Sequence, residues 1–350
     1  MSHKFPYKWN LADGYPAKGI EAHGLKVFGT FICGGGSTMG YKLARFDHIG
    51  GVEIDPKVAE VYKANHNSNH LFIEDIREFN QRKELPEELY SLDILDGSPP
   101  CSSFSMAGNR EKDWGKEKVF REGQAKQRLD DLFFDYIALA KRLQPKVVIA
   151  ENVKGMLQGN AKSYVKKVKK GFEDAGYKVQ LFLLNAASMG VPQKRERVFF
   201  VCQRNDLNLP KLKLSFNEKA IPFGEATKDL IANGKKEWIA LTDFQNEIWR
   251  KAKEGESFAK YNNGNGFNDF KAEDAAVMGT LSAQQHKYYH SKEPRHLYKS
   301  EFCALGSYPQ DYEFLDQKYG YLIGMSVPPV MTAQIAHQIY LQWFKTENKQ

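Results

Sequence analysis

The sequence contains few cysteines and no long hydrophobic run. Cys33, Cys101, Cys202 and Cys303 are the only cysteines in 350 residues, which is too few and too scattered for a disulfide framework. We therefore expect free thiols and a reducing, cytoplasmic location. The longest apolar runs, such as residues 147–150, are far shorter than the roughly 18 residues that cross a membrane, so we expect no membrane association.

Composition and charge are those of an ordinary folded protein. Hydrophobic residues make up 42% and charged residues 27% of the sequence, which argues against wholesale disorder. The net charge of +7 permits nucleic acid as a partner without requiring it. The first ten residues carry no apolar stretch, so we expect no signal peptide.

Residues 26–200 alternate between short apolar segments and longer amphipathic ones. Seven segments have the composition of buried strands: Val27–Cys33, Ile49–Ile54, Leu71–Ile73, Leu92–Leu95, Lys146–Ala150, Lys178–Leu184 and Val198–Cys202. Capping residues or helical spacing predict helices at Pro56–Asn65, Leu129–Leu143 and Ser163–Ala175. This alternation predicts an α/β fold, in which helices cover both faces of a parallel sheet.

The pattern changes after residue 205. Residues 205–295 are rich in Lys, Asn and Gly and contain one clear helical stretch, Asp243–Lys253. Regular patterning returns near the C-terminus, where Pro328-Pro329 precede a predicted helix at Val330–Trp343. At about 150 residues per domain, the chain is long enough for two domains, and we expect the terminal helix to pack against the first.

A glycine-rich turn, Cys33-Gly34-Gly35-Gly36, follows the first predicted strand. Glycines at a strand-to-helix turn let a ligand approach the backbone. Glu53 ends the second predicted strand, where Rossmann-like sites place the acid that binds ribose hydroxyls. Together these features favour a nucleoside cofactor over a tight structural turn. Asp75 follows the third strand and is either an adenine contact or a helix cap.

The fourth predicted strand leads into Ser98-Pro99-Pro100-Cys101. Ligands of open α/β folds bind at this carboxyl edge of the sheet, and a thiolate there is a natural nucleophile. A buried structural cysteine is the alternative, because single cysteines are commonly buried. The two prolines and the polar neighbours favour the reactive thiol.

Two further segments place charged side chains beside predicted strands. Glu151 closes an apolar strand, where partial burial suits a carboxyl that shares a proton with a heterocycle; a helix N-cap is an equally good interpretation. Arg195 and Arg197 alternate before the last strand, and we expect both guanidinium groups on one face, where they suit phosphate or carbonyl oxygens. A solvated charge run is the alternative.

Taken together and in this order, the Pro-Cys, Glu-Asn-Val and Gln-x-Arg-x-Arg segments resemble those of the cytosine-5 DNA methyltransferases of bacterial and phage restriction-modification systems. The resemblance covers about residues 26–202 and again 295–344. It implies a Rossmann-like sheet with an antiparallel strand near its edge. It also implies S-adenosyl-L-methionine as cofactor, S-adenosyl-L-homocysteine as product, and no metal.

The resemblance also implies roles for individual residues. Cys101 matches the nucleophile, Glu151 the glutamate that protonates the base, and Arg195 and Arg197 the motif that holds the flipped-out base. The implied cofactor-binding residues are Ile32, Gly34, Gly36, Glu53, Ile54, Asp75, Ile76, Pro100, Leu132 and Ser326. Two positions depart from the family pattern, since Ile32 stands where Phe is usual and Met325 where Asn is usual.

The same resemblance divides the chain into three parts. It implies a catalytic domain at 1–204, a target-recognition domain at 205–315, and a C-terminal segment at 316–350 that returns to the catalytic domain. Double-stranded DNA is the expected partner, with the basic loop 102–124 and the lysines of the middle segment as candidate contacts. We expect a monomer of bacterial or phage origin; a cognate restriction endonuclease that acts separately is a further candidate partner.

Three alternatives remain open at the level of sequence. A transfer RNA cytosine-5 methyltransferase shares the fold, although the long middle segment favours DNA because a sequence reader needs such a surface. A non-catalytic DNA-binding regulator is disfavoured by the intact Cys101, Glu151 and Arg197. A nicotinamide-dependent oxidoreductase suits the glycine turn and Glu53, but gives the Pro-Pro-Cys and Glu-Asn-Val segments no role.

Overall fold

A computed structural model describes residues 4–16, 19–100, 132–159, 161–230, 240–266 and 269–345. The predicted nucleophile Cys101 and the predicted loop 102–124 lie outside these residues. Within the described ranges, every helix is too short or too polar to cross a membrane.

Seven strands form the central sheet, in the order β3-β2-β1-β4-β5-β7-β6. Their bounds are β1 Lys26–Thr30, β2 Asp47–Glu53, β3 His70–Ile73, β4 Ile94–Gly97, β5 Val147–Val153, β6 Tyr177–Asn185 and β7 Glu196–Arg204. The first five strands pair in parallel, whereas β7 runs antiparallel to both β5 and β6. The seven predicted strands are confirmed, and β7 is the antiparallel strand near the edge that the resemblance implied.

The helices agree with the sequence pattern where that pattern is amphipathic. Their bounds are α1 Gly36–Leu43, α2 Pro56–Asn65, α3 Ile76–Gln81, α4 Leu132–Leu143, α5 Ala161–Asp174, α6 Phe223–Thr227, α7 Asp243–Lys251, α8 Lys299–Gly306, α9 Tyr319–Met325 and α10 Pro329–Ile339. The predicted bounds of α2 are confirmed at both ends. At its N-terminus the Asp55 side chain accepts hydrogen bonds from the N–H groups of Lys57 and Val58, and Pro56 occupies the first helical position.

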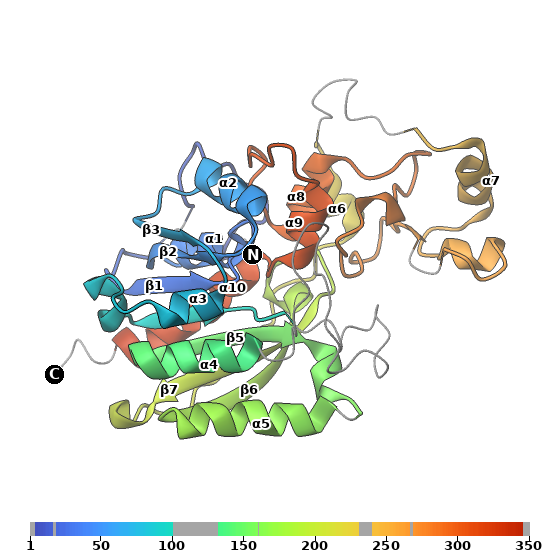
Figure 1. Cartoon of the computed structure of the whole chain (residues 1–350). Helices are drawn as coiled ribbons and strands as arrows, with labels where there is room; N and C mark the ends of the chain where they lie inside the picture. The colour runs from blue at the N-terminus through green and yellow to red at the C-terminus, as the bar shows by residue number, and fades with distance from the viewer. Residues whose placement is uncertain are drawn as a thin grey trace.

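Alternation along the strands builds a core on each face of the sheet. Val27, Ile94 and Val147 join one cluster, which also contains residues of α1 and α10. Their neighbours Phe28, Leu95 and Val148 point the other way and join a second cluster with residues of α4 and α5. Figure 1 shows α4 and α5 in front of β5, β6 and β7. Helices therefore cover both faces, as the sequence predicted.

The terminal helix α10 packs against α1, which confirms the predicted return of the chain to the sheet. A Cβ added at Gly40 of α1 would lie 2.4 Å from Thr332 Cβ of α10, so the two helices approach closely. A π-helical turn, Tyr340–Phe344, extends α10. The pair α1 and α10 links the beginning of the sheet to the end of the chain.

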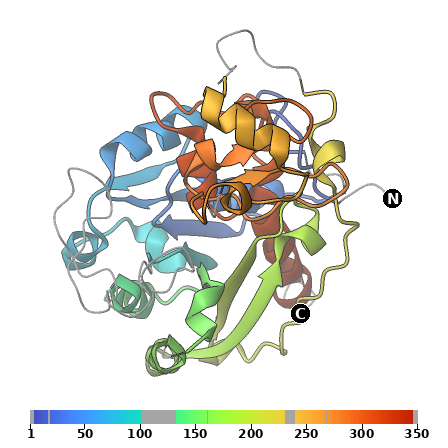
Figure 2. The ribbon, with the colours of Figure 1, turned by 90° about the vertical axis from the view of Figure 1, so that its right-hand side faces the viewer.

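A second, smaller core lies in residues 240–296, which we call the projecting segment. Leu241, Ile248, Ala252, Phe258 and Tyr289 form this cluster. The segment contains α7 and the two-stranded pair β8 Phe270–Lys271 and β9 Tyr288–Tyr289. Figure 1 shows the part that carries α7 extending away from the sheet, and Figure 2 views the molecule from the side of this part. Its short strands and many loops agree with the irregular texture of the sequence.

Candidate active site

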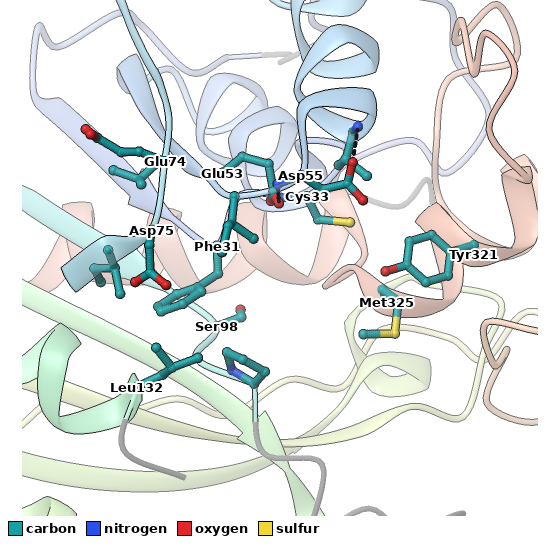
Figure 3. Close-up of a pocket in the computed structure, with 15 residues that line it drawn as sticks. Phe31, Cys33, Glu53, Asp55, Glu74, Asp75, Ser98, Leu132, Tyr321 and Met325 are labelled. Atoms are coloured by element: carbon teal, nitrogen blue, oxygen red, sulfur yellow. Dashed lines mark hydrogen bonds between the residues drawn. The ribbon is translucent and has the colours of Figure 1, made fainter. Parts of the chain in front are cut away.

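A pocket lies at the carboxyl ends of the parallel strands, where the strand order reverses between β1 and β4. Ligands of open α/β sheets bind at this switch point. The pocket is lined by Phe31, Cys33, Val52, Glu53, Ile54, Asp55, Val58, Glu74, Asp75, Ile76, Ser98, Pro100, Leu132, Tyr321 and Met325 (Figure 3). The residues after β1, β2, β3 and β4 therefore meet there, as their positions in the sequence predicted.

Glu53 is a buried carboxyl at the end of β2, with 8% of its surface exposed. One of its oxygens accepts a hydrogen bond from the Cys33 N–H and the other from the Asp55 N–H, each at 2.9 Å. Burial raises the pKa of Glu53, although these two donors oppose the shift. The carboxyl thus ties the glycine-rich turn to the end of β2 while it faces the pocket.

Asp75 lines the pocket and also caps α3, so the two interpretations of this residue are compatible. Its side chain accepts a hydrogen bond from the Arg77 N–H at 2.8 Å and pairs with the Arg77 guanidinium. Burial favours a higher pKa for Asp75, but the hydrogen bonds and charge of Arg77 outweigh it and leave the pKa below its usual value. Asp75 is therefore held as a carboxylate.

Phe31, rather than Ile32, presents a side chain to the pocket (Figure 3). Phe31 and Cys33 have φ values of 54° and 49°, so β1 ends at Thr30 and the predicted strand Val27–Cys33 is three residues too long. The Ile32 side chain lies instead within 2.6 Å of the place that a Cβ at Gly29 would occupy. An aromatic ring is therefore present at the pocket, one position before the residue that the resemblance singled out.

Three more of the predicted cofactor residues lie beside the pocket rather than in its lining. Gly36 packs against the C-terminal segment, because a Cβ there would lie 2.5 Å from the Val327 carbonyl oxygen and 2.7 Å from Ser326 Cβ. The carbonyl of Gly34 accepts a hydrogen bond from the Tyr312 hydroxyl. Ser326 accepts from the Tyr308 hydroxyl at 2.7 Å, while Met325 beside it lines the pocket. These contacts hold the glycine-rich turn against the end of the chain.

Several lining residues were not among the predicted contacts. Phe31, Cys33, Val52, Asp55, Val58, Glu74, Ser98, Tyr321 and Met325 belong to this group. Most of them adjoin a predicted residue, so proximity along the chain is the signal that identifies them. Tyr321 is different, because α9 reaches the pocket through long-range packing.

Glu151 and Arg197 form an ion pair at the ends of β5 and β7, and their Nε–Oε1 distance is 2.8 Å. Both side chains are largely buried, with 12% of Glu151 and 14% of Arg197 exposed. Burial lowers the pKa of Arg197, and the Glu151 carboxylate opposes this shift. The antiparallel pairing of β5 with β7 opposes Val153 to Arg197, which explains why these distant sequence segments meet.

Asn152 connects the Glu151–Arg197 ion pair to the segment that leads to Cys101. Its side-chain amide donates a hydrogen bond to the Pro99 carbonyl at 3.0 Å, and only 4% of the residue is exposed. The side-chain oxygen Oδ1 of Asn152 accepts a hydrogen bond from the Val153 N–H. The Glu-Asn-Val segment therefore positions Pro99, two residues before Cys101.

Arg195 has different partners from Arg197. It is 2% exposed and donates to the carbonyl oxygens of Leu281 and Gly324, at 3.1 Å and 2.9 Å. Burial and the neighbouring Arg197 lower the pKa of Arg195 to about 9. Arg195 thus joins the projecting segment to α9, whereas Arg197 pairs with Glu151.

The sheet order, the antiparallel β7 and the pocket at the switch point define a Rossmann-like α/β fold with a pocket at its carboxyl edge. Residues 25–341 match the C-5 cytosine-specific DNA methylase family. The chain belongs to this family.

Curated relatives agree with this membership. The chain is 39% identical to the type II methyltransferase M.FnuDI of Fusobacterium nucleatum over 192 residues, which are 55% of this chain and 51% of that protein. It is 27% identical to the type II methyltransferase M1.HphI of Haemophilus parahaemolyticus, over 91% of this chain and 88% of that protein. The matches with M.FnuDI and with M.NgoPII of Neisseria gonorrhoeae span only 51% and 56% of those proteins.

Solved structures support the fold. DNMT2 of Spodoptera frugiperda superimposes with a TM-score of 0.63 at 15% identity, over 90% of this chain and 99% of that chain. Dnmt2 of S. pombe gives a TM-score of 0.59 at 14% identity, over 91% and 99% of the two chains. At these identities the likeness concerns the fold alone.

Proposed function

We propose that the protein is a sequence-specific DNA (cytosine-5-)-methyltransferase that uses S-adenosyl-L-methionine. The observation that carries this proposal is the buried Glu151–Arg197 pair beside the Asn152–Pro99 hydrogen bond, which places an acid–base group near the segment leading to Cys101. Family membership supports the same reaction.

The pocket suits S-adenosyl-L-methionine. Glu53 and Asp75 offer carboxylate oxygens to a ribose and an adenine, while Phe31, Ile76 and Leu132 offer apolar surface to the adenine ring. When bound, the cofactor supplies an electrophilic methyl group on a sulfonium and leaves as S-adenosyl-L-homocysteine. The proposed cofactor contacts remain Glu53, Ile54, Asp75, Ile76, Pro100 and Leu132, with Ile32, Gly34, Gly36 and Ser326 supporting the turn beside them.

The protein side chains would activate the cytosine. Carbon 5 of cytosine is a poor nucleophile, and addition of the Cys101 thiolate to carbon 6 makes it electron-rich. Glu151 would hold a proton at ring nitrogen 3 so that this addition does not build up negative charge, and Arg197 would bind the carbonyl oxygen. Loss of the carbon 5 proton and of the Cys101–carbon 6 bond would then restore the ring and the thiolate.

The base must leave the DNA helix to reach this site, which costs a few kcal/mol of lost pairing and stacking. We propose that residues 1–204 and 316–350 carry out catalysis and that residues 205–315 contain the target-recognition domain. The separate core of the projecting segment supports this division. Residues 212–226, residues 297–344 and four residues of the projecting segment contribute side chains to the core of the sheet; the four are Ala272, Met278, Leu281 and Tyr288. The part of the projecting segment that carries α7 and the separate core is therefore the part that would meet DNA.

A methyl-transfer assay with labelled S-adenosyl-L-methionine tests the proposal, using duplex DNA and transfer RNA as separate substrates. We expect label in duplex DNA, and none with the Cys101→Ala variant, which should still bind S-adenosyl-L-homocysteine. Label in transfer RNA alone would show that RNA is the substrate and would contradict the proposal that DNA is. Unchanged turnover by Cys101→Ala would refute the role of Cys101.

We further propose that the protein acts as a monomer in the cytoplasm and that any cognate restriction endonuclease acts separately. The family includes type II methyltransferases of bacteria. Size-exclusion chromatography with light scattering tests the monomer, and a mass near 80 kDa, twice that of the 40.0 kDa chain, would contradict it.

A further inference from the structure

Asp96 is a buried carboxyl that the proposed reaction does not use. It lies at the end of β4, five residues before Cys101, and 8% of its surface is exposed. Among the described residues, no lysine, arginine or histidine lies within ion-pair distance of Asp96. Glu151 and Asp75, in contrast, each pair with an arginine. A buried carboxyl without a cation needs hydrogen-bond donors to remain in the fold.

Helix α1 supplies those donors. The Tyr41 hydroxyl donates to Asp96 Oδ1 at 2.9 Å, and Tyr41 is 1% exposed. The Ser37 side chain also hydrogen-bonds the carboxyl. Ser37 directly follows Gly36, so Asp96 contacts the helix turn that begins at the glycine-rich segment.

The backbone at Asp96 is held as well. The Thr30 hydroxyl of β1 donates to the Asp96 carbonyl oxygen at 3.3 Å. Thr30 is the last residue of β1 and Asp96 is the last but one of β4. Phe31 and Ser98, which follow these strands, line the pocket. A Cβ at Gly97 would lie 2.5 Å from the Thr30 hydroxyl and 2.6 Å from the Tyr136 ring, so this strand end has little freedom to move.

We propose that Asp96 is a positioning residue, which fixes the strand end leading to Cys101 against the glycine-rich turn of the cofactor pocket. Asn152 holds the same segment from the other side through Pro99. The segment 96–100 is therefore anchored at two points, one on α1 and one on β5. This inference rests on the proposed function, because it assigns Asp96 to the alignment of nucleophile and cofactor.

The charge of Asp96 determines how strongly this anchor holds. A carboxylate accepts stronger hydrogen bonds from hydroxyl groups than a neutral carboxyl does. Burial raises the pKa of Asp96 to about 7, with a further contribution from the negative charge of Glu151, while Tyr41 and Ser37 oppose the shift. The titratable groups that face Asp96 are Tyr41 on α1, Tyr136 on α4 and Glu151 on β5.

Turnover as a function of pH tests the proposal, with the wild type and Asp96→Asn compared between pH 6 and pH 8. An amide can accept from Tyr41 and donate to Ser37, so it keeps both contacts without a charge. A group that titrates near pH 7 is about one-tenth ionised at pH 6 and about nine-tenths ionised at pH 8. We expect the ratio of kcat at pH 8 to kcat at pH 6 to be several-fold larger in the wild type.

Asp93→Asn is the matched control, because Asp93 lies at the opposite end of β4 and binds the Lys26 N–H and the Lys146 ammonium. It should keep the wild-type pH profile. Because Asp93→Asn keeps Asp96, Glu151 and Cys101, it reports the pH dependence that arises without any change at Asp96. Tyr41→Phe, which removes one donor, gives an independent measurement and should lower kcat more at pH 8 than at pH 6.

Parallel pH profiles for the wild type, Asp96→Asn and Tyr41→Phe would overturn the proposal, even if methylation itself is found. Asp96→Ala should lose at least tenfold in kcat, and Asp96→Asn should recover most of that loss at pH 6. Equal loss in both variants would indicate a purely structural role. Absence of methylation by the wild type would overturn the proposed function and this inference together, whereas cofactor binding would remain measurable.

Discussion

Two buried arginine–glutamate pairs in the described part of the chain differ in how completely their polar atoms are bonded. Arg295 and Glu301, at the base of the projecting segment, form two hydrogen bonds of 2.8 Å. Glu301 also accepts from the Tyr298 N–H, and Arg295 lies 3.7 Å from the centre of the Tyr298 ring. Arg197 and Glu151 share one contact of 2.8 Å, and in the described part of the chain Glu151 makes no other hydrogen bond.

This difference separates a structural pair from a chemical one. A pair whose donors and acceptors are all bonded has none left for a substrate, and removing one member leaves a buried charge without compensation. A pair with free acceptor positions can exchange a proton or bind a base. We therefore expect substitutions at Glu301 to act on folding and substitutions at Glu151 to act on turnover.

The largest expected effect is that of Glu151→Gln on catalysis. The amide keeps the size of the side chain but cannot hold a proton at ring nitrogen 3, so kcat should fall by about 10²- to 10⁴-fold. Single-turnover methylation measures this loss. The affinity for S-adenosyl-L-homocysteine should stay within about twofold of the wild type; a variant with normal turnover would contradict the assignment.

Glu301→Gln should show the reverse pattern. The substitution removes the charge of Glu301 and leaves the buried Arg295 with the half-exposed Glu293 as its remaining carboxylate partner. We expect a loss of about 3 kcal/mol in the free energy of unfolding. Urea unfolding followed by circular dichroism measures it. The comparison between the two pairs fails if Glu151→Gln destabilises the fold as much as Glu301→Gln does.

The pH dependence of stability should change in Asp96→Asn. Because the pKa of Asp96 is raised to about 7, its contribution is fully present below about pH 4 and is lost as the pH rises through about 7. The wild type should therefore lose more stability between pH 5 and pH 8 than the variant does. Urea unfolding at both pH values tests this, and identical changes in the two proteins would argue against a raised pKa.

Glu53→Gln should weaken cofactor binding. The Gln amide cannot accept hydrogen bonds from both the Cys33 and Asp55 N–H groups and also receive a ribose hydroxyl, so we expect about a tenfold loss of affinity, or about 1.4 kcal/mol. Calorimetry with S-adenosyl-L-homocysteine measures this affinity. Glu74→Gln is the control, because Glu74 lines the same pocket but pairs with Arg82. An equal loss of affinity in Glu74→Gln would contradict the assignment of Glu53 as the residue that binds the ribose.

The smallest effect concerns Lys154 and Glu196, an ion pair of 2.7 Å near the same strand ends. Both side chains are about 40% exposed, so solvent screens the interaction. Lys154→Met should change the free energy of unfolding by less than about 1 kcal/mol. A loss of unfolding free energy as large as that of Glu301→Gln would show that solvent exposure does not determine how much these two ion pairs stabilise the fold.

The sequence predicted the sheet well because its signal is local. Alternating apolar residues such as Val147 and Val148 serve opposite faces, and this period is visible without a structure. Helices α8 and α9 were not predicted individually, because almost every residue of α8 is buried and no polar face marks its period.

The candidate site was predictable only where its residues follow strand ends. Glu53 and Asp75 were found in this way, whereas the ring of Phe31 depends on a positive φ that the spacing does not reveal. The contacts of Asn152 with Pro99 and of Arg195 with Leu281 and Gly324 join residues far apart in sequence. A single sequence gives no signal for such pairs.

Bisulfite sequencing of DNA from cells that express the protein tests the central claim most directly. Cells with the wild-type protein should show protected cytosines at one recurring sequence, and cells with Cys101→Ala should show none. Both proteins should accumulate to equal levels. Equal protection by Cys101→Ala, or no protected cytosine with an abundant, cofactor-binding wild type, would contradict the account.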